Sequence, residues 1–196
     1  MKNHHVIDDI RALPDAALLQ QFFHADTRQI LAECNESLLA VLARRNCSKR
    51  QRTLLAGIEV ARRAVLEELS AMKSLTSPCL VNEYLHLHFL GCEEERFCAV
   101  WLDARNRPIA FDELFRGTLT QASVYPREVA RRALQRNAAS VIFAHNHPSG
   151  TAEPSHADEL LTQNLKKTLA LVDVRVLDHF IVAGAATLSF AQRGLL

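Results

Sequence analysis

The stretch AASVIFAHNHPSG, residues 138–150, decides the fold and the chemistry expected of this chain. Residues 139–144 are apolar, rich in β-branched and aromatic side chains, and flanked by turn-forming residues, which predicts a buried strand. Side chains two residues apart on a strand point to the same face, so His145 and His147 should converge on one point, with Asn146 turned away. The segment 148–150 should end the strand, because proline cannot donate to a ladder and glycine permits a sharp exit.

Ser155 and Asp158 extend these histidines into the pattern H-x-H, seven residues, S, two residues, D. Two imidazoles and one carboxylate are typical of catalytic zinc, which takes three protein ligands and keeps a fourth position for water. The pKa of such a water falls from about 15.7 to about 7. Ser155 and Asp158 also suit the N-cap and N3 positions of a capping box that opens a helix. The two interpretations are compatible, because a helix start would hold an acidic ligand rigidly.

The segment from His145 to Asp158 resembles the RadC (UPF0758) family, within the JAB/MPN or JAMM metalloprotease-like superfamily. The resemblance covers about residues 76–196 and includes FCAVWLDARNR (97–107), LFRGT (114–118), SVYPREV (123–129), VRVLDHFIV (174–182) and QRG (192–194). It implies an MPN/JAB1-type mixed sheet flanked by helices. This agrees with the α/β or α+β class that the interleaved helical and strand patterns indicate.

The resemblance also implies residue roles. His145, His147 and Asp158 would bind Zn²⁺, and Ser155 would help to stabilise the oxyanion formed when a carbonyl is attacked. The implied activity is that of a zinc-dependent metallopeptidase or isopeptidase acting on a peptide or protein substrate.

The family pattern further requires an upstream glutamate that deprotonates the water and returns the proton to the leaving amine. Glu95 matches the family's Glu-x-Phe. Glu94 and Glu113 stay open as alternatives, because the acidic run 93–95 allows a shift of one residue and Glu113 lies on the next expected strand. The base must come within about 2.6–3.2 Å of its proton.

Composition indicates an ordinary soluble protein. The chain has 196 residues, 48% of them hydrophobic, and a net charge of +1, which leaves room for one medium domain and one small domain. No apolar stretch approaches the roughly 20 residues of a membrane span, and the N-terminus lacks a signal-peptide core. Five cysteines form no C-x-x-C pair, as expected in a reducing cytoplasm.

The organisation along the chain predicts a helical domain at residues 1–73 and a metal-binding domain at 74–196. Helices are expected at 14–23, around 38–42, from a capping box at 48–51 to about 72, and between Pro78 and Gly91. Strands are expected near 96–103, 107–115, 139–144, 174–183 and 186–190, with helices from Pro126 and from Ser155 to about Leu171.

The helical region carries a basic cluster that could contact nucleic-acid phosphates. The cluster consists of Arg44, Arg45, Lys49, Arg50, Arg52, Arg62 and Arg63. In RadC relatives this region resembles a helix-hairpin-helix element, whose turn contains glycine so that the backbone can approach a phosphate closely. Residues 45–47 of this chain contain no glycine. Weak DNA contact and a solvated basic helix face both stay open. The alternative function is therefore a non-catalytic, DNA-associated or scaffold protein.

Two further sequence features need an interpretation. His86 and His88 form a second H-x-H inside an expected helix, where residues two apart point about 200° away from each other and cannot share a metal. Partly packed histidines are the better interpretation. Asp178 and His179 should face opposite ways on a strand, with one of them giving structural support near the metal. Trp101 should lie in the core.

Overall fold

The computed structural model describes residues 17 and 20 and the ranges 49–71, 78–117 and 124–196. The chain forms two compact units, Met1–Val60 and Ala61–Leu196, and the sheet lies in the second. Residues 17 and 20 are helical; the rest of the expected helix at 14–23, the helix around 38–42 and the predicted boundary between residues 73 and 74 lie outside the described residues.

Two helices precede the sheet along the chain. The long helix expected towards residue 72 is α5, Lys49–Ala71, and the helix expected between Pro78 and Gly91 is α6, Pro78–Phe89. Gly91 has a positive φ of 73°, a conformation that glycine adopts without steric cost just past the end of α6.

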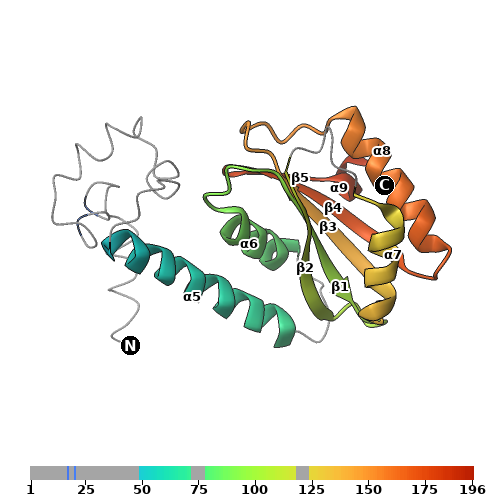
Figure 1. Ribbon diagram of the computed structural model, residues 1–196, viewed down its shortest axis with the longest axis horizontal. Helices are drawn as coiled ribbons and strands as arrows, with labels where there is room; N and C mark the ends of the chain where they lie inside the picture. Colours follow the sequence, from blue (N-terminus) through green and yellow to red (C-terminus); the bar gives the residue numbers. More distant parts are fainter. Residues whose placement is uncertain (1–16, 18–19, 21–48, 72–77, 118–123) are drawn as a thin grey trace. The chain divides into compact units, whose positions relative to one another are not determined.

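A five-stranded sheet forms the centre of the second unit (Figure 1). Its strands are β1 (Arg96–Leu102), β2 (Pro108–Arg116), β3 (Ser140–Asn146), β4 (Arg175–Ala183) and β5 (Ala186–Ser189), in the order β2-β1-β3-β4-β5. Only the β3–β4 pair is parallel among the described strands; the other neighbours are antiparallel. The predicted mixed sheet is confirmed.

Helices cover both faces of the sheet. On one face α6 packs against alternate side chains of β1, β3 and β4, including Val100, Ile142 and Val182. On the other face lie α7 (Pro126–Gln135) and α8 (His156–Ala170) (Figure 1). The buried cluster on this face includes Trp101 and Phe143. Strand residues with odd numbers in β3 therefore face α7 and α8, and those with even numbers face α6.

Trp101 lies in the core, as predicted, and is fully buried. Its indole N–H donates to Asp112 Oδ2 at 2.8 Å, and the Arg136 guanidinium binds the same carboxylate. The core therefore contains one satisfied polar group beside β1.

The C-terminal end of the domain adds an element that the sequence patterns did not indicate. A short helix, α9 (Phe190–Arg193), follows β5 directly and buries Phe190 against Ile181 and Leu188. In the part of the chain that the structure describes, no helix combines the length and apolar character needed to cross a membrane.

Candidate metal centre

Strand β3 delivers both histidines of the opening motif to one place. His145 lies inside β3, and His147 follows its end and continues the ladder by donating its backbone N–H to Val182 O at 2.9 Å. Val141 and Phe143 of β3 lie on the α7/α8 face and Ile142 and Ala144 on the α6 face, so the strand alternation places His145 and His147 on the α7/α8 face and Asn146 on the α6 face. Gly150, with a φ of 82°, then turns the chain back, and its N–H donates to His147 O at 3.1 Å.

The start of α8 delivers the carboxylate. Ser155 is the N-cap, and its side chain accepts a hydrogen bond from the backbone N–H of Asp158, while the Asp158 carboxylate accepts one from the backbone N–H of Ser155. The predicted capping box is confirmed. It fixes the direction of the Asp158 side chain relative to the first turn of the helix.

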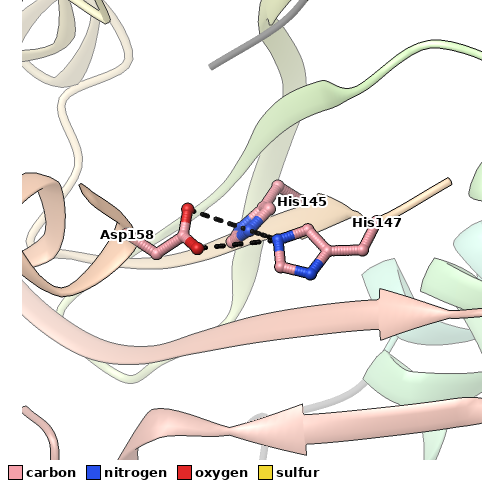
Figure 2. Close-up of side chains that lie close together, drawn as sticks. All are labelled: His145, His147 and Asp158. Atoms are coloured by element: carbon pink, nitrogen blue, oxygen red, sulfur yellow. Dashed lines mark hydrogen bonds and ion pairs between the residues drawn. The ribbon is translucent and has the colours of Figure 1, made fainter. Parts of the chain in front are cut away.

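The three side chains meet in a small space (Figure 2). His145 Nε2 lies 2.9 Å from His147 Nε2, and these nitrogens lie 3.3 Å and 3.6 Å from the Asp158 carboxylate oxygens Oδ1 and Oδ2. One donor atom from each residue lies within 4.8 Å of the others, so the group could hold a metal ion. His145 and Asp158 are buried, whereas His147 is half-buried. Of the three residues, His147 is therefore the most accessible to solvent.

The electrostatics of the two histidines differ. Burial lowers the pKa of His145, against the opposing effect of the Asp158 carboxylate, so this ring is neutral. The Asp158 carboxylate, 3.6 Å from His147 Nε2, raises the pKa of His147. Burial raises the pKa of Asp158, but its contacts with the two histidines outweigh this effect and lower that pKa overall. The metal-free site thus favours a charged pair between His147 and Asp158.

Each histidine is held through its second ring nitrogen. His147 Nδ1 lies 2.8 Å from Thr151 O, a carbonyl that can only accept, so Nδ1 carries the proton and Nε2 is left for a metal. His145 Nδ1 lies 2.8 Å from Nε2 of His179, which is buried on β4. His179 is therefore the member of the Asp178–His179 pair that lies beside the site, while Asp178 accepts hydrogen bonds from Ser189 Oγ and from the backbone of α9.

The backbone around Glu95 is fixed next to the two histidines. In the β1–β3 register Phe97 pairs with His145, the last pair of the ladder. Extending this register two residues past Phe97 predicts that Glu95 lies across from His147, with its side chain on the same face. Asn146 accepts a hydrogen bond from Arg96 N at 2.8 Å and donates one to Glu94 O at 3.0 Å. Its side chain thus clamps the peptide groups on either side of Glu95.

Other observations agree with this placement of Glu95. The N–H of Gly117 donates to Glu95 O at 2.8 Å, which holds the segment from the β2 side as well. The largest effect on the pKa of His145 is burial, and the largest on the pKa of His147 is the Asp158 carboxylate. The negative charge of Glu95 makes a smaller contribution that raises the pKa of both histidines.

The two alternative glutamates lie elsewhere. Glu94 is exposed and lies at a bend before β1. Glu113 is on β2, as expected, and its carboxylate binds Arg96 at 3.3 Å and Arg116 at 3.0 Å. Neither is brought to the His145–His147–Asp158 group.

Sequence patterns did not reveal two residues that support the site, Asn146 and Thr162. Thr162 lies one helical turn after Asp158, and its hydroxyl lies 2.6 Å from His179 Nδ1. The sequence signal for Asn146 is its place inside the H-x-H, where it was expected only to turn away. The Asn146 contacts depend on the pairing of β1 with β3, and the Thr162 contact depends on the packing of α8 against β4.

The fold and the site together define a class: a helix-flanked mixed-sheet domain with a histidine–histidine–aspartate group that could bind a metal. The model of the RadC-like JAB domain family matches residues 75–195, more than half of the chain, and the chain belongs to this family.

Curated relatives agree with the family assignment. A UPF0758 protein of Nitrosospira multiformis is 64% identical over 143 residues, which is 73% of this chain and 64% of that relative. UPF0758 proteins of Nitrosomonas eutropha and Thiobacillus denitrificans are 61% and 59% identical over the same length, with the same coverage. The chain thus spans slightly less than two thirds of the length of these relatives, and their names state no activity.

Proposed function

We propose that the protein is a zinc-dependent hydrolase of peptide or isopeptide bonds. The observation that carries the proposal is the group of three metal donors, His145, His147 and Asp158, which the end of β3 and the start of α8 bring together. Two imidazoles and one carboxylate are a ligand set that catalytic zinc uses, with one position left open.

The donor atoms fit a zinc ion closely. On a tetrahedral ion with bonds of about 2.0–2.1 Å, two ligand atoms are about 3.3 Å apart. The distances here are 2.9 Å between the imidazole nitrogens and 3.3 Å and 3.6 Å from them to the Asp158 oxygens, so only a few tenths of an ångström of adjustment are needed. A bound zinc ion would supply an acidified water and polarise the carbonyl of the substrate.

Glu95 is our candidate for the general base. Glu95 is half-buried, and the extended β1–β3 register predicts a position opposite His147, which suits a carboxylate that takes a proton from the attacking water and returns it to the leaving amine. The two hydrogen bonds from Asn146 would keep the Glu95 backbone still during both transfers.

Ser155 is our candidate for the donor to the oxyanion. Its hydroxyl donates to Asp158 Oδ2 at 2.6 Å, and the residue is exposed. A hydroxyl rotates freely about its C–O bond, so the same proton can turn from the carboxylate to a substrate oxygen. Losing one donor of this kind costs roughly 10²–10³ in kcat in well-studied acyl-transfer sites.

The experiment that tests the proposal combines metal analysis with a substrate screen. Metal analysis of the purified protein should find one zinc per chain. Quenched fluorescent peptides and lysine-isopeptide-linked peptides would be the substrate probes. Glu95→Gln should lower the turnover number by about 10²–10⁴-fold without loss of zinc.

Matched controls are available in the same acidic run and on β2. Glu94→Gln and Glu113→Gln should leave turnover within a few-fold of the wild type, because neither side chain reaches the site. A protein that binds no zinc at neutral pH contradicts the proposal, and so does full activity in Glu95→Gln.

The non-catalytic, DNA-associated alternative has its basis in the basic cluster. Of its members, Arg62 already donates to the Tyr84 hydroxyl at 2.9 Å and lies 5.8 Å from that ring, which commits part of its charge to packing. DNA affinity measured against salt concentration tests the alternative, because phosphate contacts are strongest at low ionic strength. No binding there would remove it.

A further inference from the structure

A continuous chain of buried hydrogen bonds runs from His145 back to α8. His145 Nδ1 lies 2.8 Å from His179 Nε2, His179 Nδ1 lies 2.6 Å from Thr162 Oγ1, and Thr162 Oγ1 donates to Asp158 O at 2.6 Å. His145, His179 and Thr162 are all completely buried. The chain therefore links β3, β4 and α8 without contact with water.

The direction of every proton in this chain follows from its last member. The carbonyl of Asp158 can only accept, so the single hydroxyl proton of Thr162 is donated to it. Thr162 Oγ1 must then accept from His179 Nδ1–H. A neutral imidazole has one N–H, so His179 Nε2 accepts from His145 Nδ1–H. The proton of His145 is thus on Nδ1, and its Nε2 is the nitrogen that faces Asp158 and His147.

We infer that His179 and Thr162 are positioning residues that fix the tautomer and the ring orientation of His145, so that its Nε2 lone pair faces the metal. The inference rests on the proposed metal site and deepens it. Metal-bound histidines commonly donate their other N–H to a second group, which sets the ring direction and raises the basicity of the ligand. Here the second group is the imidazole of His179. Thr162, on the helix that carries Asp158, determines in turn which nitrogen of His179 carries the proton.

The side chains around His179 are apolar and cannot replace it as the hydrogen-bond acceptor for His145. Its ring stacks on Phe190 with centroids 4.7 Å apart and meets Phe97 and Phe143 edge-on at 5.4 Å and 6.2 Å. His145 and His179 are both fully buried, so loss of the His179 acceptor would leave the Nδ1–H of His145 without a hydrogen-bond partner. His147 differs, because its Nδ1 is held by Thr151 O in an exposed loop.

The test uses paired substitutions in the full chain. Thr162→Val removes the hydroxyl at nearly constant volume, and Thr162→Ser keeps it. His179→Leu removes the acceptor, and His179→Gln keeps a carbonyl oxygen near the position of Nε2. Zinc affinity is measured by competition with a chelator of known affinity, and thermal unfolding of the metal-free proteins reports whether each variant is folded.

We expect zinc to bind about 10–100-fold more weakly to Thr162→Val and His179→Leu. Thr162→Ser and His179→Gln should recover most of this loss. A role in packing alone would instead favour leucine over glutamine among the phenylalanines. The structure also offers a matched control, because His86 Nε2 lies 2.8 Å from Thr187 Oγ1 on the opposite face of the sheet. Thr187→Val should leave zinc affinity unchanged.

Nitrogen-15 spectra of histidine-labelled, zinc-loaded protein give a second readout. We expect the proton of His145 on Nδ1 and that of His179 on Nδ1, with His179 Nε2 unprotonated. A proton on His179 Nε2 overturns the inference. So does a wild-type protein that binds zinc while folded Thr162→Val and His179→Leu bind it equally well; in that case the proposed function stands. A wild type that binds no zinc overturns both.

Discussion

The chain contains two H-x-H sequences, and only one of them brings its histidines together. His145 and His147 belong to a strand end, and their Nε2 atoms lie 2.9 Å apart. His86 and His88 belong to α6, where they point in different directions. The spacing is identical, so the difference comes from the backbone period: two residues per repeat in a strand and 3.6 in a helix.

The helical pair has structural contacts instead of a common ligand. His86 lies 3.1 Å from Gly184 O and 2.8 Å from Thr187 Oγ1, which ties α6 to the β4–β5 hairpin. His88 packs on Phe111 with ring centroids 4.5 Å apart, and its Nε2 lies 3.6 Å from Cys98 Sγ. The predicted role of partly packed histidines is confirmed. Whether two histidines at this spacing can share a metal thus depends on the secondary structure that carries them.

The largest expected effect is on zinc affinity. His147→Ala should weaken binding by more than the roughly 10–100-fold that loss of a supporting partner costs, because it removes a ligand itself. His88→Ala should leave the affinity unchanged. Titration calorimetry with zinc on both variants measures the difference, and equal affinities would remove the distinction between the two motifs.

The middle residues of the two motifs give the next comparison. Asn146→Ala should lower the free energy of unfolding by about 1–3 kcal/mol, because Arg96 N and Glu94 O each lose a buried partner. It should also lower turnover with little loss of zinc, since the Glu95 segment is no longer clamped. Chemical denaturation and the fluorescent peptide assay measure both effects.

Leu87→Ala is the matched control for this prediction, because Leu87 is the half-buried middle residue of the helical motif. It should cost some stability and leave kcat as it is. Unchanged turnover in a folded Asn146→Ala protein would show that Glu95 needs no such support.

The pH dependence of zinc binding follows from the raised pKa of His147. Because this folded pKa lies above the ordinary value of 6.5, the bond with Asp158 stabilises the metal-free protein fully below that value. The stabilisation is lost as the pH rises through the folded pKa. Zinc needs the neutral ring, so its affinity should rise with pH over the same interval, by about tenfold per unit while one proton is released.

Zinc titrations across about pH 5–8 measure this rise. The His86→Ala variant should show the same profile as the wild type, because that ring takes no part in the metal centre. An affinity independent of pH would contradict the assignment of the proton to the His147–Asp158 pair.

The smallest expected effect is a loss of protein stability when the helical histidine His86 is replaced. His86→Ala should reduce the free energy of unfolding by about 0.5–1.5 kcal/mol through the lost contacts with Gly184 O and Thr187. Thermal unfolding of the metal-free protein measures it. A loss as large as that of Asn146→Ala would show that α6 depends on His86 more than its partly exposed contacts indicate.

Local sequence was sufficient for most of the elements. The apolar run before His145 predicted β3, the capping pair Ser155 and Asp158 predicted α8, and Pro126 predicted the start of α7. Each of these patterns spans only a few residues, so it can be recognised without knowledge of the rest of the chain. Helix α9 was not predicted, because four residues are too few to show a helical periodicity and the helix is stabilised by the burial of Phe190.

The choice among the glutamates depended on long-range pairing. Glu94 and Glu95 are neighbours with the same chemistry, and the choice of Glu95 rests on extending the β1–β3 register two residues past the pair Phe97↔His145. A slip of one residue would exchange their faces. The catalytic role of Glu95 stays a prediction, with the Glu95→Gln variant as its test.

By itself, the sequence determined the family, the strand that aligns His145 with His147 and the capped helix that starts beside Asp158, because each depends on short-range periodicity or on a specific string of residues. Only the tertiary structure decided what surrounds them. The β3–β4 pairing sets Phe143 beside His179, and this brings an imidazole 34 residues away to within 2.8 Å of His145. Such a contact depends on strand order and register, which no local pattern encodes.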